Sequence, residues 1–438
     1  MVDSPTTQSH ARHWAVLVGC CLLVGFGFTI PMLSFGVFLS PMVAYFDCSV
    51  TEVSIYFTFI AASAVFSSAL GARFLHSSMR ATVVVSSFAI GLAFFALALF
   101  PAVPMVWVTG VVAGLGFPLC STVLVPIAIN KWFAVRQGTF IGIALAMVGV
   151  FGMMFSPAFT AIIGAWGWRV ALVVAGTMLI VANCLVAFFL LRQDPALLGL
   201  KPYGFEDHVA EAVQEAGVSA EEDLRANTPV EEITPAEENL DASSLLRRKA
   251  FWLCAVAALI GGFFGVYNSQ LNTVAQTSGF DPVVAGLALS SASAGLMVGK
   301  VFMGWLKDQK GSTFAICFGC ASGIVAFLIT AFGVTSGNVA FLYLGAVLAG
   351  CCTCLATLSA AFLASAAFEP ALYSQSVAYL TSFCNLGMAL GVPFYSVTYD
   401  LVGSYLPVLL ACAVIPVICA LVAATGIRVG RKTMEQAA

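Results

Sequence analysis

The sequence predicts an all-α membrane protein with twelve transmembrane helices in two pseudo-symmetric six-helix bundles. Hydrophobic residues make up 61% of the chain and charged residues 9%, whereas soluble domains average about 25% charged residues. Apolar stretches long enough to cross a bilayer recur along the chain, and features of the first six reappear in the last six. Composition therefore excludes a water-soluble globule.

Each predicted span contains roughly 20 mostly apolar residues, the length that the hydrocarbon core of a bilayer requires. All are expected to be helices, because a chain inside lipid must satisfy its own backbone hydrogen bonds. The predicted helices cover residues 14–39, 53–72, 82–100, 105–129, 139–163, 168–191, 251–275, 283–306, 313–333, 339–367, 374–396 and 405–427.

The basic residues predict the orientation of these helices. If the N-terminus is cytoplasmic, Arg169 is the only Lys or Arg at an external end of a span. Lys and Arg favour the cytoplasmic side, so we expect a multi-pass plasma (cell inner) membrane protein with both termini in the cytoplasm. The first span is too long for the apolar region of a signal peptide, so we expect it to remain in the mature protein.

An acidic stretch separates the sixth span from the seventh. Residues 192–249 hold 13 of the 21 Asp and Glu residues of the chain. We therefore expect an N-terminal six-helix bundle over residues 1–192, an acidic cytoplasmic linker over 193–249 and a C-terminal six-helix bundle over 250–438. The composition favours a solvated, partly disordered linker, and a regulatory or partner-binding segment is the alternative.

An internal repeat supports the division into two sets of six helices. Residues in the first set recur in the second at offsets of 229 to 236 positions: the Phe-Gly-Val-Phe of 35–38 and the Phe-Gly-Val-Tyr of 264–267, Phe46-Asp47 and Phe280-Asp281, Gly71 and Gly304, and Pro157 and Pro393. Repeated six-helix halves joined by a loop are an architecture of secondary transporters, which hold substrate near the midplane between the halves.

The loop after the eighth span carries a family motif. The sequence of residues 304–311, Gly-Trp-Leu-Lys-Asp-Gln-Lys-Gly, resembles the G-x-L-x-D-x-x-G loop motif of the major facilitator superfamily, with Gly304, Asp308 and Gly311 in register. This resemblance spans almost the whole chain and implies the major facilitator fold. It also implies that Gly304, Asp308 and Gly311 control closure of the inner gate.

The equivalent first-half motif is degenerate. Gly71 is kept and Arg80 remains, but Leu75 stands where the motif has Asp and Ser78 where it has the second Gly. The resemblance therefore implies an inner gate governed by Gly304, Asp308 and Gly311. Gly71, Arg73 and Arg80 are expected on the opposite side of that gate.

A second set of residues indicates a branch of the superfamily. Asn-Lys-Trp-Phe at 130–133, Arg-Gln-Gly at 136–138 and Gly-Trp-Arg at 167–169 resemble the oxalate/formate antiporter and monocarboxylate transporter branch. Carboxylate carriers of this branch place a basic residue, usually Arg, four positions before the loop-motif Gly. Lys300 stands four positions before Gly304, so the resemblance implies that it faces the ligand.

Lys300 is also unusual without any resemblance, because it is the only charged residue between Asp281 and Lys307. An ionised Lys near the centre of a bilayer costs roughly 2.5 to 3.5 kcal/mol on insertion scales, so it normally faces a cavity, a partner or a ligand. The alternative is that Lys300 reaches towards the interface or pairs internally. One cation suits one carboxylate, which favours a monocarboxylate as the substrate.

Other features expected of this branch are missing. Leu33 stands near the position of a Lys in monocarboxylate carriers, Leu296 occupies the position of their Asp, and the helix over 374–396 lacks the Lys of oxalate carriers. Asn268, Asn272, Ser382 and Asn385 are further candidates for orienting the substrate, and hydrogen bonding between helices is the alternative for each. The series Gly138, Gly142, Ala146 and Gly149 predicts close helix packing.

The sequence favours transport over other functions. No His, Asp or Glu for a proton relay and no catalytic or metal-ligating constellation lies inside the predicted spans, so an enzyme is disfavoured and no cofactor is expected. The basic residues form no single patch for nucleic acid. We expect a monomeric secondary active or facilitative carrier of a small organic anion, working by exchange or facilitated diffusion. The alternatives are an exporter of hydrophobic or cationic compounds and a non-transporting membrane sensor.

Overall fold

The structure, a computed structural model, describes residues 5–205 and 242–437. Its first half contains α1 (Pro5–Leu23), which continues through η1 (Val24–Leu33) and η2 (Ser34–Phe38) into α2 (Leu39–Phe46). The remaining elements of this half are α3 (Val50–Leu99), α4 (Val103–Cys120), α5 (Leu124–Trp132), α6 (Gln137–Trp166), α7 (Trp168–Leu185), η3 (Val186–Leu190) and η4 (Ala196–Leu198).

The second half begins with the short α10 (Ala242–Arg247) and is helical throughout. It contains α11 (Lys249–Thr277), α12 (Pro282–Ser336), α13 (Val339–Leu348), α14 (Gly350–Thr353), α15 (Leu355–Ala367), η7 (Pro370–Leu372), α16 (Tyr373–Val402) and α17 (Leu406–Ala437).

Ten helices of the described residues are long and apolar enough to cross a membrane, and two of them are long enough to cross twice. The two long spans contain 48 and 54 residues. At 1.5 Å per residue each would measure more than about 70 Å, over twice the roughly 30 Å hydrocarbon core. Each bends at one non-helical residue, α3 at Ser78 and α12 at Gly311 with φ 83°. The described chain therefore makes twelve crossings, which confirms the predicted fold class.

Three of the predicted helices are interrupted within the membrane. The first span changes from α-helix to π-helix at Val24 and to 3-10 helix at Ser34, with Pro31 inside the π segment. The fourth breaks after Cys120, two residues beyond Pro118, and the tenth breaks around α14. Proline lacks the N–H that would continue the helix ladder, which explains the first two breaks. Hydrophobicity alone carries no signal for them.

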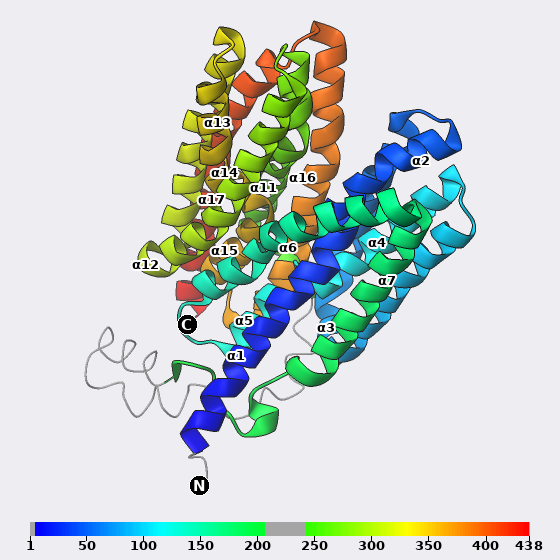
Figure 1. The fold of residues 1–438 in the computed structure, drawn as a ribbon. Coiled ribbons are helices and arrows are strands. Elements are labelled where there is room, and N and C mark those ends of the chain that lie inside the picture. Colours follow the sequence, from blue (N-terminus) through cyan, green and yellow to red (C-terminus); the bar gives the residue numbers. More distant parts are fainter. Residues whose placement is uncertain (1–4, 206–241, 438) are drawn as a thin grey trace.

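The helices form two groups that meet at one end of the molecule. Figure 1 shows α1 to α7 in blue to green on one side and α11 to α17 in green to red on the other. Both chain ends lie at the same end of the molecule, which we call the termini face. The two groups converge towards this face and diverge away from it. Contact between the groups is made mainly by α6 with α12 and by α3 with α16.

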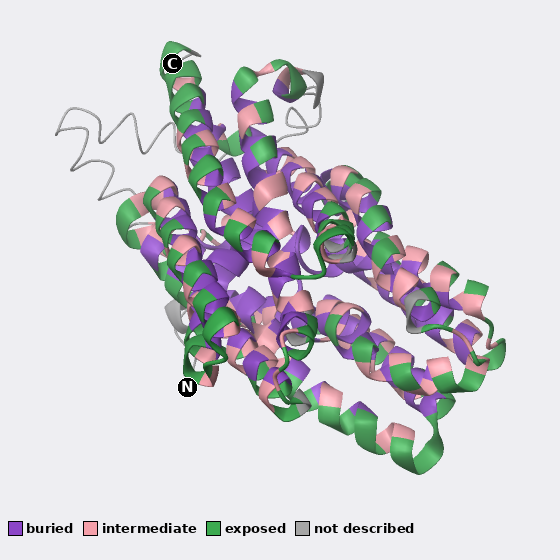
Figure 2. Cartoon of the chain, turned by 90° about the horizontal axis from the view of Figure 1, so that it is seen from above, coloured by how far each residue is buried: buried purple, intermediate pink, exposed green. Residues whose placement is uncertain are grey.

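Burial follows the same plan. Figure 2 shows buried residues on the helix surfaces that turn towards one another and exposed residues around the outside. Large apolar side chains such as Phe66, Leu99 and Leu401 are exposed on the described surface. Such exposure is unusual for a soluble protein, and it is what a lipid-facing surface requires.

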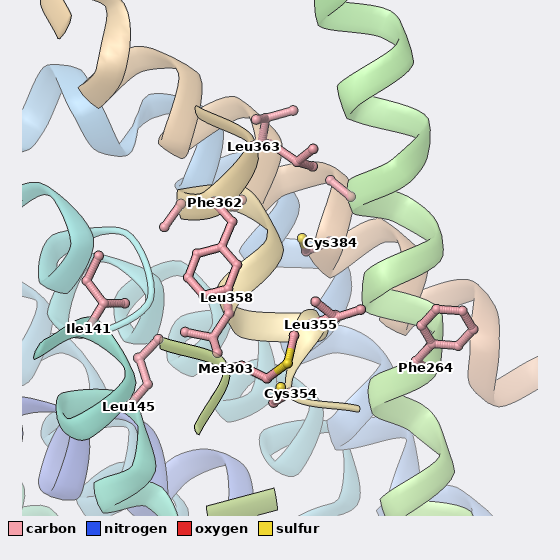
Figure 3. Packing of buried hydrophobic residues seen from close by; sticks show 14 of the residues in the cluster. Ile141, Leu145, Phe264, Met303, Cys354, Leu355, Leu358, Phe362, Leu363 and Cys384 are labelled. Carbon is pink, nitrogen blue, oxygen red and sulfur yellow. The ribbon is translucent and has the colours of Figure 1, made fainter. Parts of the chain in front are cut away.

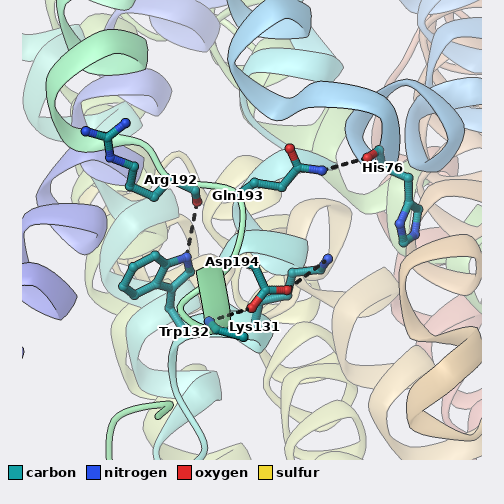
Figure 4. Close-up of polar contacts among 7 residues, drawn as sticks. His76, Lys131, Trp132, Arg192, Gln193 and Asp194 are labelled. Carbon is teal, nitrogen blue, oxygen red and sulfur yellow. Dashed lines mark hydrogen bonds and ion pairs between the residues drawn. The ribbon is translucent and has the colours of Figure 1, made fainter. Parts of the chain in front are cut away.

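Residues 192–205, which we call the strap, pack against the first half at the termini face. Figure 4 shows that the indole N–H of Trp132 donates to the Arg192 carbonyl and that Gln193 donates to the His76 carbonyl. Lys131 lies 3.8 Å from the Asp194 carboxylate. The first part of the expected acidic linker is thus ordered against the helices, and residues 206–241 of that linker lie outside the described chain.

Candidate functional site

Lys300 lies at the contact between the two halves. Its side chain is 2% exposed, and its ammonium group donates a hydrogen bond of 3.1 Å to the carbonyl oxygen of Leu145 in α6. Leu145 is eight residues into α6, about 12 Å from the start of that helix at 1.5 Å per residue. The amine is therefore directed into the protein between α6 and α12.

Glycines bring α6 and α12 close enough for this bond. A Cβ atom on Gly142 would overlap the main-chain carbonyl of Lys300, and one on Gly138 would lie 2.5 Å from the Gly304 carbonyl oxygen. Gly149 packs against the side chain of Met297. The small-residue series predicted to serve helix packing thus forms a strip along which the two halves touch, and at Gly138 and Gly142 main chain lies against main chain.

Apolar side chains of α6, α12 and α15 pack together beside Lys300. Figure 3 shows Ile141 and Leu145 of α6 turned towards Leu358 and Phe362 of α15, with Met303 of α12 beside them. All five are buried in one hydrophobic cluster. These five side chains, which we call the apolar plug, fill the interior between α6, α12 and α15.

Asp308 closes the same face with hydrogen bonds to the start of α6. Its Oδ1 accepts from the main-chain N–H of Gly138 at 2.8 Å, and its Oδ2 accepts from both the N–H and the hydroxyl of Thr139 at 2.6 Å. The first N–H groups of a helix have no partner inside it, and the helix dipole favours an anion there. A carboxylate from one half therefore caps a helix of the other.

The other expected gate residues lie around this contact in different ways. Gly304 makes the close approach to Gly138, and Gly311 adopts the left-handed conformation that turns the chain between the eighth and ninth crossings. Gly71 packs against Val123 within the first half. Arg73 is exposed, and Arg80 donates to the Leu191 carbonyl of its own half at 3.0 Å.

The second contact between the halves uses neutral side chains. The Ser382 hydroxyl in α16 donates to the Val65 carbonyl of α3 at 2.7 Å. The Asn385 amide donates to the Ser68 hydroxyl at 2.9 Å. Both α16 side chains are buried. In this conformation, then, two residues expected at the substrate hold α16 against α3.

Asn268 lies beside the break in the tenth crossing. Its amide nitrogen donates to the Thr353 hydroxyl at 3.3 Å, and its amide oxygen is buried with no hydrogen-bond partner among the described residues. The side chain of Asn272 lies outside the described part of the structure.

Sequence reasoning missed two partners in this site. The Leu145 carbonyl that receives Lys300 is a main-chain group, so its residue type carries no signal for it. Thr139 lies at the first turn of α6, where a hydroxyl next to a helix N-terminus is a recognisable pattern. The glycine series beginning at Gly138 could have pointed to α6 as the partner of α12.

A model of the major facilitator superfamily matches residues 16–336 and 266–437. The chain belongs to the major facilitator superfamily. This confirms the family that the loop motif around Asp308 predicted from the sequence.

Relatives of this superfamily member include monocarboxylate transporters. Monocarboxylate transporter 1 of Rattus norvegicus is 25% identical over 438 residues, covering 93% of this chain and 83% of the relative. Monocarboxylate transporter 1 of Bos taurus is 25% identical over 332 residues, covering 72% of this chain and 64% of the relative. The chain thus spans slightly less than two thirds of the bovine protein. A shorter match, 26% identical over 45% of this chain and 41% of the relative, is to the membrane sensor protein UhpC of Salmonella typhimurium.

Solved structures show the same fold. The proton:xylose symporter XylE superposes with a TM-score of 0.72 at 12% identity, covering 94% of this chain and 95% of that one. The fucose:proton symporter FucP of E. coli superposes with a TM-score of 0.64 at 12% identity, covering 95% and 99%. Both are structures of major facilitator transporters, and at this identity the likeness concerns the fold alone.

Proposed function

We propose that this protein is a carrier that moves a small organic anion, a monocarboxylate, across the plasma membrane by alternating access. The observation that carries the proposal is the position of Lys300. It is a buried cation at the contact between the two halves, where secondary transporters hold their substrates. The monocarboxylate transporters among the relatives, which are carriers and not enzymes, support the same substrate class.

The charge of Lys300 selects an anion. Among the described residues its ammonium group donates to a neutral carbonyl, and the ion pairs of these residues, Lys131–Asp194 and Arg248–Glu369, do not involve it. An ammonium group has three donors, so it has capacity for a ligand. In a poorly screened site a carboxylate would supply both the missing charge and the missing acceptors.

The surroundings of Lys300 favour a ligand with one carboxylate and an apolar body. Met297 lies one turn further from the termini face on α12, against Gly149. Leu33 of η1 packs against Gly152 one turn further along α6, and it is 46% exposed. A second carboxylate would need a second cation, and no Lys or Arg other than Lys300 occurs between Asp281 and Lys307.

Alternating access would proceed by rocking of the two halves. The bias of Lys and Arg supports a cytoplasmic position for the termini face. With that orientation, the contacts of Asp308, the glycine strip and the apolar plug would close the carrier to the cytoplasm. Opening would separate α6 from α12 and α3 from α16 around Lys300. The proposed carrier acts as a monomer.

A sensor is the second candidate, because UhpC is among the relatives over part of the chain. A sensor would bind the same anion without carrying it across the membrane. Binding and flux must therefore be measured separately.

The test is uptake of labelled benzoate by proteoliposomes, with a thermal-shift measurement on the same purified protein. Wild type should take up benzoate and melt at a higher temperature in its presence, because only ligands of the native state raise the melting point. Lys300→Ala should lose both effects. Lys310→Ala is the matched control, because this exposed Lys of the same helix lies over the ring of Phe314. Stabilisation without uptake would favour the sensor.

A further inference from the structure

We infer that the hydrogen bond from Lys300 to the Leu145 carbonyl, which we call the bolt, also holds the empty carrier closed at the termini face. A bound carboxylate breaks this bond. The inference rests on the proposed function, since it assigns the anion-binding group a second task. In the structure the ammonium group of α12 is bonded to the main chain of α6, which belongs to the other half. The same group cannot serve a ligand fully and keep this bond.

The bond to Leu145 can be broken without damage to α6. A helical carbonyl oxygen accepts from the N–H four residues later, which for Leu145 is Gly149. It has two lone pairs, so the Lys300 ammonium takes the second one. Removing the ammonium leaves the helix ladder intact. The hydrogen bond between Lys300 and Leu145 is therefore not needed for the hydrogen bonding within either helix. It can form and break while both helices stay intact.

A carboxylate should replace the Leu145 carbonyl as the hydrogen-bond acceptor of the Lys300 ammonium group. The donor is ionised in both bonds, but only the carboxylate adds the attraction between two opposite charges, which is strong in a poorly screened site, whereas a peptide carbonyl carries no net charge. An anion reaching Lys300 would thus convert a bond between the halves into a bond between α12 and the ligand. The interaction energy of the ammonium group would then stabilise the bound ligand and no longer the contact between α12 and α6.

The position of the bond makes it decisive for opening. Along α6 the contacts with α12 run from Gly138 at Gly304, through Gly142 at the Lys300 carbonyl, to Gly149 at Met297. The Lys300–Leu145 bond lies within this strip. Separating the helices would leave a buried ammonium without a partner, which is strongly unfavourable unless an anion has already paired with it. Opening and anion binding are therefore coupled, and the coupling acts equally in both directions.

The hydrogen bonds described at the α3–α16 contact do not involve a charged group that an anion could pair with. They join Ser382 to the Val65 carbonyl and Asn385 to Ser68, and all of these groups are neutral. An anion would gain no ion pair by replacing one of these neutral acceptors. The anion therefore acts on α6 and α12, and α3 and α16 follow when the halves rotate.

The test measures the separation of the two halves at the termini face by pulsed electron paramagnetic resonance. Spin labels are introduced through non-canonical amino acids at Ser77 in α3 and Lys432 in α17, both exposed. The variants are wild type, Lys300→Met and Lys310→Met, each alone, with benzoate and with the neutral analogue benzamide. Wild type should show one short distance alone and with benzamide, and a longer population with benzoate.

Lys300→Met should show the longer population without any ligand, raised at least about tenfold over empty wild type, because its loss removes a charge-assisted hydrogen bond. Lys310→Met should behave as wild type. If Lys300→Met stays closed while benzoate still opens wild type, the bolt is refuted and the anion carrier stands. If Lys300→Met opens but benzoate neither opens nor stabilises wild type, Lys300 still holds the closed state, whereas release by a carboxylate and the proposed function both fail.

A measurement on wild type alone covers the case in which Lys300→Met does not fold. Amide hydrogen exchange at Gly138 and Thr139, whose N–H groups are bonded to Asp308 in the closed state, reports opening directly. Benzoate should accelerate their exchange and benzamide should not. Slower exchange with benzoate would contradict the bolt.

Discussion

The carboxylate of Asp308 caps the helix that begins beside Gly138, and it does so from the opposite half of the molecule. The Asp308 Oδ1 accepts the Gly138 N–H at 2.8 Å. Because capping and the helix dipole both favour a negative charge at this place, the contact stabilises the state that is closed at the termini face.

Replacing this carboxylate should therefore open the termini face. Asp308→Asn keeps the shape of the side chain but loses the charge, which we expect to destabilise the closed state by about 1 to 2 kcal/mol. That corresponds to a roughly 5- to 30-fold change in the ratio of closed to open protein. Distances between labels at Ser77 and Lys432 would measure it. Unchanged distances and transport kinetics would show that Asp308 does not govern the gate.

The close approach of Gly138 to Gly304 predicts a steric effect. Gly138→Ala would place a Cβ 2.5 Å from the Gly304 carbonyl oxygen, and overpacking of this kind costs about 1 to 3 kcal/mol. We expect the closed state to be depleted and the turnover of the carrier to fall. Gly164→Ala is the control in the same helix, since nothing lies within 4 Å of its added Cβ. Equal turnover in the two variants would contradict the main-chain contact.

Transport kinetics can distinguish a role of Asn385 at the α3–α16 contact from a role in binding the substrate. It bonds Ser68 across the α3–α16 contact, so Asn385→Ala should destabilise the closed state by about 1 kcal/mol, the typical worth of a hydrogen bond. If Asn385 acts at this contact, the maximal rate should change and the KM for benzoate should stay within about twofold. A large rise in KM with an unchanged rate would instead place Asn385 at the substrate.

The π-helical segment of the first crossing has a side-chain support that can be tested by stability. The Tyr56 hydroxyl donates to the Pro31 carbonyl at 2.8 Å, and Tyr56 is fully buried. Tyr56→Phe removes only this bond, which should cost about 0.5 to 1.5 kcal/mol. The melting temperature of the purified protein should fall by a few degrees. A higher or unchanged melting temperature would mean that the bond contributes nothing to stability.

The overall fold was predictable because lipid imposes strict rules. Hydrophobic length identified the crossings, and the repeat of Gly71 as Gly304 indicated two halves. The interruption near Pro31 was not predicted, because the same apolar composition suits an α-helix and a π-helix. The turn at Gly311 was foreseen through the loop motif, although it joins two crossings into one long bent element.

The site was predictable only in part. Lys300 stood out because charge is rare in a membrane span, but its partner is the main chain of Leu145, which no side-chain pattern encodes. Ser382 and Asn385 illustrate a second reason. Polar groups in the middle of a span suit both a ligand and a neighbouring helix, and only the structure shows that α3 receives them in this conformation.

The most direct test of the anion carrier is a charge series at Lys300, measured as initial uptake of labelled benzoate into proteoliposomes. Lys300→Arg keeps the charge and should retain measurable uptake. Lys300→Gln loses the charge and should reduce kcat/KM by at least about 30-fold, as expected when one partner of a buried charge pair is removed. Uptake by Lys300→Gln at the wild-type rate would show that the charge of Lys300 does not bind the transported anion.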